Sequence, residues 1–274
     1  MFFSGWKGED VVEPDAVRAA ATVELIHLAT LVHDDILDDA ALRHASPTLF
    51  AKYGAHTAVL LGDAIFAHAL KLMSDFDDVE LCRALAVATR KICTGEIWLT
   101  TERGNAALSL EDYFEIIQMK TGELFEVCAL LGASLAGRGA DTGAAFARFG
   151  RHLGRAYQIF DDIVDYLGTE SAIGKTLGTD LSSGKFTLPE ILFFRGLDAR
   201  EREAFLAEAA AGTLALGDVS ERMRAAGVFG ESREYFLKET RLAADALAPY
   251  AGTPGTEHLL ALADFVAAQV RKIS

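Results

Sequence analysis

The chain has 274 residues, 51% of them hydrophobic, and a formal net charge of −14 at pH 7. This length allows one large domain or two small ones, and so acidic a balance excludes a general nucleic-acid binder, which needs a basic face. Only five prolines and many Ala and Leu residues favour long packed helices over strands, so we expect an all-α protein.

Long helices are predicted over the first 168 residues, because apolar side chains recur there at helical spacing. The acidic run SDFDD at residues 74–78 marks a break, and Ser109 with Asp112 three residues later resembles a capping box that starts a new helix. No strand pair or hairpin signal is found. The predicted helices lie at about 14–41, 46–73, 79–104, 109–139 and 142–167.

The stretch from Gly168 to Glu190 is the one long irregular segment. Long loops inside compact domains are typically lids or binding loops. Shorter helices follow at roughly 187–195, 199–211, 217–226, 230–249 and 255–272. No low-complexity linker divides the chain, so a single domain over residues 1–274 is expected.

Three cysteines, Cys82, Cys93 and Cys128, lack CxxC spacing and fall within apolar helical patterns. This favours reduced core thiols in a cytoplasmic protein. No uninterrupted apolar run approaches the roughly 20 residues that span a bilayer, so no transmembrane segment is expected. The start, MFFSGWKGED, does not resemble a signal peptide.

The segment HDDILDDAALR at residues 33–43 is the first chemical signal. In a helix, Asp34 and Asp38 share one face, as do Asp35 and Asp39. Stacked carboxylates repel each other, and a hard cation such as Mg²⁺, which typically shares one or two carboxylates with substrate phosphates, removes that cost. The preceding VELIHLATLV is too apolar for a solvated acidic helix, so we expect the cluster to project into a cavity.

A second cluster, DDIVD at Asp161 to Asp165, repeats the pattern of the first. Basic residues follow both clusters, namely Arg43 after the first and Lys175 and Lys185 after the second. Two carboxylate clusters with nearby cations are suited to hold metal ions and to stabilise a departing diphosphate. Apolar walls around the rest of the cavity would fit an apolar, cation-forming substrate.

These motifs resemble the trans-isoprenyl diphosphate synthase (polyprenyl synthetase) family. The first resembles DDxxDxxxxRRG, and YQIFDDIVDYLGTESAIGKTLGTDLSSGKFTLP resembles FQxxDDxxD followed by GKxxGxDLxxGKxTLP. KTGELF at Lys120 resembles the family's KT segment, and LLGDAIF around Asp63 its GD helix. The resemblance implies a helical bundle of the isoprenoid synthase type around a central cavity. It also implies a homodimeric, Mg²⁺-dependent prenyltransferase of isoprenoid biosynthesis that condenses an allylic prenyl diphosphate with isopentenyl diphosphate.

The resemblance also implies roles for individual residues. The metal-binding set, holding three ions with diphosphate bound, is Asp34, Asp35, Asp38, Asp161, Asp162, Asp165 and Asp180. The cations that grip the allylic diphosphate are Arg43, Lys120, Lys175 and Lys185, and His27 contacts isopentenyl diphosphate. Thr121 and Gln158 lie near the reacting carbon. Small residues at Ala29 and Thr30, five and four positions before Asp34, imply a deep pocket and a product of about C20 or longer.

The sequence departs from the family on the isopentenyl side. It contains no GGKRxRP before the first motif, His44 stands where the second Arg of the RR pair is expected, and Leu99 takes the Gln place of GExxQ. Replacing Arg by His removes a bidentate cation. Three explanations stay open: the chain begins at an internal methionine of a longer synthase; it is a non-catalytic or regulatory subunit of a hetero-oligomeric prenyl synthase; or it ionises an allylic diphosphate as a hydrolase or terpene cyclase.

Overall fold

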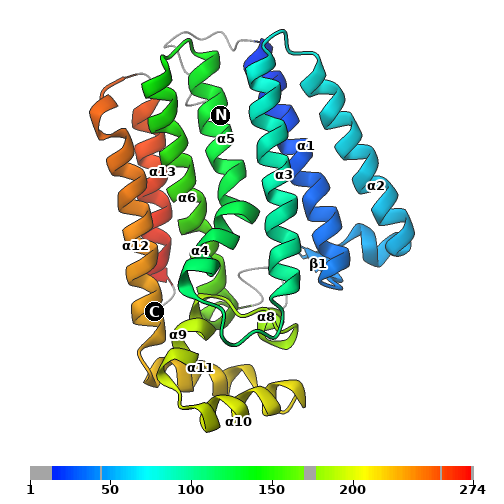
Figure 1. The fold of residues 1–274 in the computed structure, drawn as a ribbon, viewed down its shortest axis with the longest axis vertical. Helices are drawn as coiled ribbons and strands as arrows, with labels where there is room; N and C mark the ends of the chain where they lie inside the picture. Colours follow the sequence, from blue (N-terminus) through cyan, green and yellow to red (C-terminus); the bar gives the residue numbers. More distant parts are fainter. Residues whose placement is uncertain (1–13, 44, 170–176, 254, 273–274) are drawn as a thin grey trace.

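A computed structural model describes residues 14–43, 45–169, 177–253 and 255–272. Long helices stand side by side along the long axis, and short helices close one end of the bundle (Figure 1). The predicted all-α class is confirmed. The main helices are α1 (Pro14–Leu37), α2 (Leu49–Ser74), α3 (Val79–Thr101), α4 (Leu110–Ile117), α5 (Glu123–Leu135), α6 (Ala140–Leu167), α8 (Thr179–Ser182), α9 (Leu188–Gly196), α10 (Ala199–Ala210), α11 (Leu216–Ala225), α12 (Val228–Leu247) and α13 (Thr256–Gln269).

The predicted helix starts are set by identifiable caps. Ser109 accepts a hydrogen bond from the Asp112 N–H at 3.0 Å, as its capping signal predicted. Asp78, at the end of the acidic break, caps α3 by accepting from the Glu80 N–H at 2.8 Å. Short 3₁₀ turns, η2 (Ala248–Tyr250) and η3 (Val270–Lys272), follow α12 and α13.

The prediction of no strand pair was wrong for a short stretch after α1. Strands β1 (Leu42–Arg43) and β2 (Ser46–Pro47) pair antiparallel, with Leu42 opposite Pro47. The first helix ends at Leu37, earlier than predicted, and Asp39 takes a left-handed φ of 48°. The Thr48 hydroxyl then donates to the Ala40 carbonyl at 2.7 Å, which fixes the returning chain.

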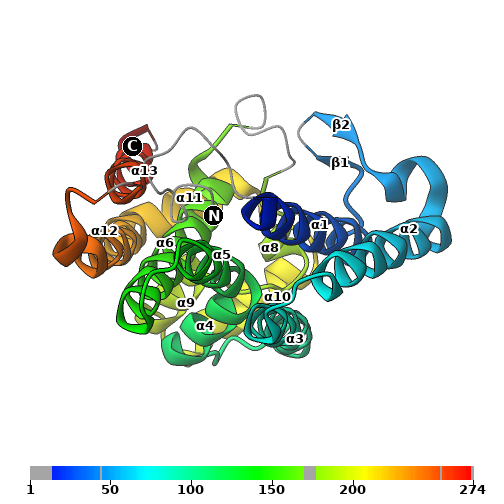
Figure 2. The same cartoon turned by 90° about the horizontal axis from the view of Figure 1, so that it is seen from above.

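The predicted helix at 109–139 is in fact two helices joined by a π-helical turn, η1 (Gln118–Gly122). Such turns are rare and frequently lie at functional sites. Seen from above, α5 lies between α1 and α6 in the middle of the bundle (Figure 2). The turn at its start is therefore placed against the interior.

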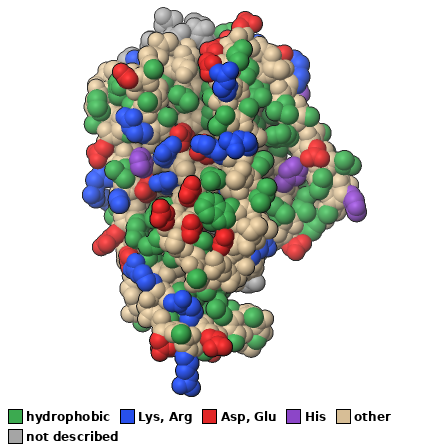
Figure 3. All heavy atoms as spheres, viewed as in Figure 1, with side chains coloured by type: hydrophobic (Ala, Val, Ile, Leu, Met, Phe, Trp, Pro, Cys, Tyr) green, Lys and Arg blue, Asp and Glu red, His purple; other side chains and the backbone are tan. Residues whose placement is uncertain are grey.

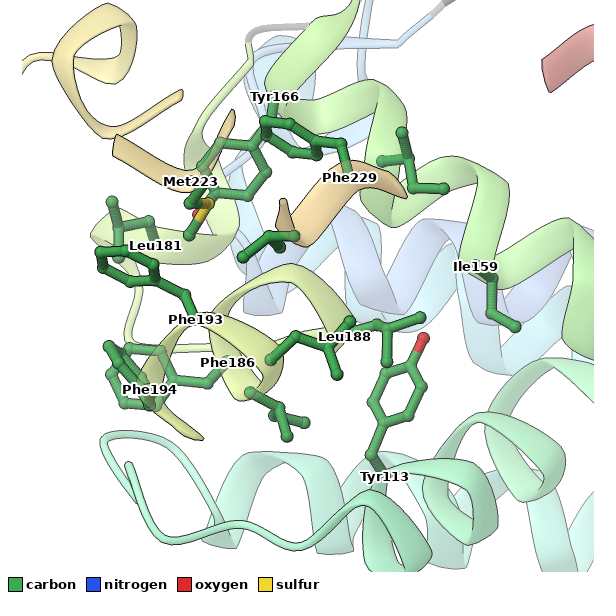
Figure 4. Packing of buried hydrophobic residues seen from close by; sticks show 14 of the residues in the cluster. Tyr113, Ile159, Tyr166, Leu181, Phe186, Leu188, Phe193, Phe194, Met223 and Phe229 are labelled. Atoms are coloured by element: carbon green, nitrogen blue, oxygen red, sulfur yellow. The ribbon is translucent and has the colours of Figure 1, made fainter. Parts of the chain in front are cut away.

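Buried side chains form three hydrophobic clusters. The largest lies among α4, α6 and the helices α9 to α12, where rings such as Phe186, Phe193 and Phe194 pack with Leu188 and Met223 (Figure 4). A second joins α1, α2, α3 and α5, and a third joins α5, α6, α12 and α13. The clusters hold the long helices in place around the acidic motifs.

Two earlier expectations about the chain need qualification. The three cysteines are free thiols, but Cys93 is exposed, so the prediction that all three lie in the core was wrong for that residue. By length and composition, α1 and α2 are each apolar enough to cross a bilayer, a test that core helices of water-soluble proteins also pass. The predicted lack of a transmembrane segment and the single domain stay predictions.

Candidate active site

The carboxyl ends of α1, α3 and α6 lie at the same end of the bundle, next to α8 (Figure 1). Asp34, near the end of α1, faces Lys120 of η1 and Glu96 of α3, and all three charges act on one another. The pKa of Asp34 is raised to about 6, chiefly by burial and also by the charges of Glu96 and Asp38, against the opposing effect of Lys120 and Lys185. The site thus concentrates negative charge that a cation can neutralise.

Lys120 is held by Glu96, with which it forms an ion pair. Burial lowers the pKa of Lys120, but the charges of Asp34 and Glu96 outweigh it, so the net pKa lies above the ordinary value. Glu96, the acidic residue of the GEIWL segment, was not predicted as a site residue. Leu99 in the same segment packs against the largest hydrophobic cluster.

The π turn approaches its neighbours more closely than side chains would allow. A Cβ built on Gly95 of α3 would lie 2.6 Å from the Lys120 backbone nitrogen, and one on Gly154 of α6 would lie 2.8 Å from the Gly122 Cα. These two glycines let α3 and α6 pack directly against the turn. They thereby set the depth at which Lys120 and Thr121 enter the site.

The opposite side of the turn carries a separate polar network. The Gln118 side chain accepts a hydrogen bond from Arg155 Nε at 3.1 Å and donates to Glu126 Oε2 at 2.9 Å. Arg151 pairs with both Glu126 oxygens, each at 2.9 Å. A surface cavity of about 400 Å³ lies beside this network, away from the Asp34 cluster. These hydrogen bonds fix the Gln118 side chain of η1.

Arg43, the last residue of β1, contacts the first acidic cluster. Its Nε donates to Asp35 Oδ1 at 2.8 Å, and the Asp35 side chain is only 7% exposed. Because the buried Asp35 carboxylate pairs with Arg43, we expect Asp35 to hold the Arg43 guanidinium in place. His44, the next residue, lies outside the described residues.

Asp38 is held by two cations. Lys185 Nζ contacts Asp38 Oδ1, and Arg103 Nη2 lies 3.6 Å from the same oxygen. Lys185 is buried at 6% exposure, and its backbone N–H donates to the Asp180 carbonyl at 2.9 Å. Lys185 therefore joins the first motif to the segment after the second. Lys175 lies outside the described residues.

The second cluster is organised by a chain of hydrogen bonds. Thr121 Oγ1 donates to Gln158 Oε1 at 2.8 Å, and Gln158 Nε2 donates to Asp162 Oδ1 at 2.9 Å. The Tyr113 hydroxyl donates to the other Asp162 oxygen at 2.5 Å. Burial raises the pKa of Asp162 well above its ordinary value. The chain connects Thr121 and Gln158, both predicted site residues, to a tyrosine that sequence reasoning missed.

The other predicted residues lie nearby or on the same helices. Asp161 is half-buried on α6, Asp165 is buried one turn further, and the charge of Asp180 acts on Asp162. On α1, Ala29 is buried at 1% exposure, whereas His27 is exposed. The Thr30 hydroxyl donates to the His27 carbonyl at 2.8 Å.

The donor set fits a hard divalent cation. The side chains at both motifs are carboxylates, and the desolvated Asp34 lies beside like charges that a cation would offset. Across the described ranges, no three His, Cys, Asp or Glu side chains are already gathered closely enough to hold a metal.

A helical bundle with two acidic motifs at one end of its helices, and with Lys120 and Lys185 beside the first motif, is an isoprenoid synthase fold. Residues 2–222 match the polyprenyl synthetase family, and the chain belongs to that family of prenyltransferases. The predicted resemblance is thereby confirmed. Members of this family generally use Mg²⁺ with diphosphate substrates.

Three relatives illustrate the match. All-trans-nonaprenyl-diphosphate synthase (geranyl-diphosphate specific) of Rhodobacter capsulatus is 35% identical over 85% of this chain and 71% of its own length. Heptaprenyl diphosphate synthase component 2 of Bacillus subtilis is 39% identical over 62% of this chain and 49% of its own. A polyprenyl synthase of Caulobacter crescentus, solved with calcium and isoprenyl diphosphate, has a TM-score of 0.88 and 33% identity, covering 97% of this chain and 81% of that one.

Proposed function

We propose that this chain condenses an allylic prenyl diphosphate with isopentenyl diphosphate to give a longer trans-polyprenyl diphosphate. The observation that carries this proposal is the pair of lysines, the half-buried Lys120 and the buried Lys185, held beside the carboxylates of Asp34 and Asp38. Buried cations next to metal-binding carboxylates are what a diphosphate leaving group requires. The allylic diphosphate would lie between these lysines and the two acidic motifs.

The residues at the end of α1 and on α6 would hold the metal ions. Asp34 of α1 and Asp38, the residue after its end, are proposed ligands, together with Asp161 and Asp165 of α6. Three ions are proposed with diphosphate bound. Asp35 and Asp162 act differently in this proposal, because their oxygens already accept hydrogen bonds from Arg43, Tyr113 and Gln158. Bound Mg²⁺ would supply charge neutralisation of the leaving diphosphate.

The protein side chains then control the allylic cation. Thr121 and Gln158, fixed by their mutual hydrogen bond, present oxygen atoms whose partial negative charge stabilises a cation beside them. Lys120 and Lys185 stabilise the charge on the departing diphosphate. The isopentenyl double bond attacks, and a proton is lost to the released pyrophosphate.

A product of about C20 or longer is proposed from the small residues of α1. Ala29 is buried, and beyond it along α1 the apolar second cluster contains Ile26 and Val23. Leu60 of α2 is 68% exposed, so it does not close this space from within the chain. The names of the relatives, nonaprenyl and heptaprenyl synthases, support a long product.

A homodimer is proposed through α2. Its outer face exposes Val59, Leu60 and Leu70 at 41%, 68% and 41%, and hydrophobic side chains are visible over the edge where α2 lies (Figure 3). Exposed apolar faces of this kind mark subunit interfaces. The similarity to a protein named component 2 favours a second candidate, a catalytic subunit that needs a different partner chain.

The test incubates the purified chain with Mg²⁺, farnesyl diphosphate and radiolabelled isopentenyl diphosphate, with a chelator control. Elongated labelled product that disappears with the chelator supports the proposal. Pyrophosphate release without incorporated label would instead indicate ionisation without condensation. Activity only after addition of a partner chain would indicate the hetero-oligomeric subunit.

A cytoplasmic location is proposed with this function.

A further inference from the structure

Arg103, just after the end of α3, places a positive charge at the acidic site. This arginine belongs to neither acidic motif. Arg103 follows the last helical residue of α3, Thr101, by two positions, and its guanidinium reaches the end of α1. Nη2 lies 3.6 Å from Asp38 Oδ1 and donates to the Leu37 carbonyl at 3.4 Å. The side chain is 29% exposed, although its Nε atom is buried.

Arg103 and Lys185 are placed together by a backbone contact between their neighbours. The Gly104 N–H donates to the Gly184 carbonyl at 2.8 Å, which ties the end of α3 to the residue before Lys185. Both glycines have left-handed φ angles, 79° and 71°, which favour glycine. The chain therefore turns sharply on each side of this hydrogen bond. The neighbouring residues Arg103 and Lys185 are thereby brought close together.

The two cations share one oxygen. Lys185 and Arg103 both face Asp38 Oδ1, so two positive charges meet a single carboxylate. Arg103 Nε is buried and has no hydrogen-bond partner among the described residues. Guanidinium groups are suited to bidentate binding of phosphate, and an unused N–H beside an Nη group is half of that fork.

We propose that Arg103 is a further binding residue for the donor diphosphate. This inference rests on the proposed function, because it assumes that the donor diphosphate lies at Asp38. While no metal is bound, Arg103 and Lys185 neutralise Asp38. Binding of a divalent cation by the Asp38 carboxylate would free both side chains to bind diphosphate oxygens. Arg103 thus competes with the metal for Asp38 and cooperates with it in holding diphosphate.

Removal of Arg103 should change the affinities for Mg²⁺ and for pyrophosphate in opposite directions. Calorimetry measures binding of Mg²⁺ alone, and then of inorganic pyrophosphate at saturating Mg²⁺. Arg103→Gln should bind Mg²⁺ about 3-fold tighter, because a nearby positive charge is removed. The same variant should bind pyrophosphate about 10-fold more weakly, because charge-assisted hydrogen bonds are lost. Arg103→Lys should restore the wild-type Mg²⁺ affinity and recover only part of the pyrophosphate affinity.

Arg83→Gln in α3 is the matched control, since Arg83 is exposed and pairs with the nearby Glu80. It should change neither affinity. Weaker binding of both Mg²⁺ and pyrophosphate by Arg103→Gln, together with a lower melting temperature, would show that Arg103 merely tethers α3 to α1 and would overturn the inference. Unchanged pyrophosphate affinity would overturn it too. If the wild-type protein bound no pyrophosphate with Mg²⁺, the donor site itself would be refuted, whereas binding without elongation would leave the Arg103 inference standing and refute only the condensation.

Discussion

The Tyr113 hydroxyl donates a 2.5 Å hydrogen bond to Asp162 Oδ2, and both side chains are buried. Asp162 Oδ1 accepts from Gln158, which in turn accepts from Thr121. Tyr113 therefore lies at one end of a chain whose other end faces the reacting carbon in the proposed mechanism. A residue of α4 thereby orients side chains of η1 and α6.

Tyr113→Phe removes the hydroxyl and leaves one Asp162 oxygen without its donor. The free energy of unfolding should fall by about 1–3 kcal/mol, as is usual for a buried polar group left unpaired. The rate constant for product formation should fall about 10-fold, because Gln158 and Thr121 lose their fixed orientation. Tyr250→Phe, in η2, is the control and should change neither quantity. Unchanged turnover in Tyr113→Phe would show that the hydrogen-bond chain is only structural.

The raised pKa of Asp34 predicts a pH-dependent stability. Its folded-state pKa of about 6 lies above the ordinary value of 3.8, so the folded protein keeps a proton that the unfolded chain releases between these values. The stability contributed by Asp34 therefore falls as pH rises through this window. Asp34→Asn should raise the free energy of unfolding by about 1–3 kcal/mol at pH 7.5 and by little at pH 4.

Denaturant titrations at the two pH values check this, with Asp77→Asn at an exposed position as the control. Equal effects of Asp34→Asn at both pH values would contradict the assignment. In the wild-type protein, the same ionisation predicts weaker Mg²⁺ binding as pH falls below about 6, because a carboxylate must lose its proton to bind the metal.

Gly95→Ala tests the packing of the π turn. The new Cβ would lie 2.6 Å from the Lys120 nitrogen and 2.7 Å from the Met119 Cβ, so the turn has to move. We expect a loss of about 1–3 kcal/mol in stability and weaker pyrophosphate binding, since Lys120 is displaced. Gly230→Ala in α12, where a Cβ meets nothing within 4 Å, should be neutral or slightly stabilising. Pyrophosphate affinity equal to wild type in Gly95→Ala would argue against this role of the turn.

Ala29→Phe tests product length. A phenyl ring at this buried position of α1 should close the apolar space below the site and shorten the product, at a packing cost of about 1–3 kcal/mol. Leu28→Phe, at a position 40% exposed on the same helix, should leave the length unchanged. Chromatography of the dephosphorylated products gives the answer. An identical chain length in Ala29→Phe and wild type would place the pocket floor elsewhere.

Much of the fold could be predicted because it is local. Helical spacing of apolar residues located most of the helices, and the Ser109 cap was predicted from its own neighbours. The π turn could not be predicted, since it depends on Gly95 and Gly154 from helices that are distant in sequence. For the same reason Glu96, Tyr113 and Arg103 were missed. Each lies outside the two acidic motifs and reaches the site only through tertiary packing.

The most direct test compares two neighbouring carboxylates at the end of α1. Asp38 faces Lys185 in the site, whereas Asp39 is exposed with a left-handed φ of 48° that Asn also tolerates. The measurement is incorporation of labelled isopentenyl diphosphate with Mg²⁺ and farnesyl diphosphate. The proposed site predicts that Asp38→Asn lowers the rate by at least about 100-fold and that Asp39→Asn retains it. Equal rates in the two variants would contradict a metal–diphosphate site at Asp38.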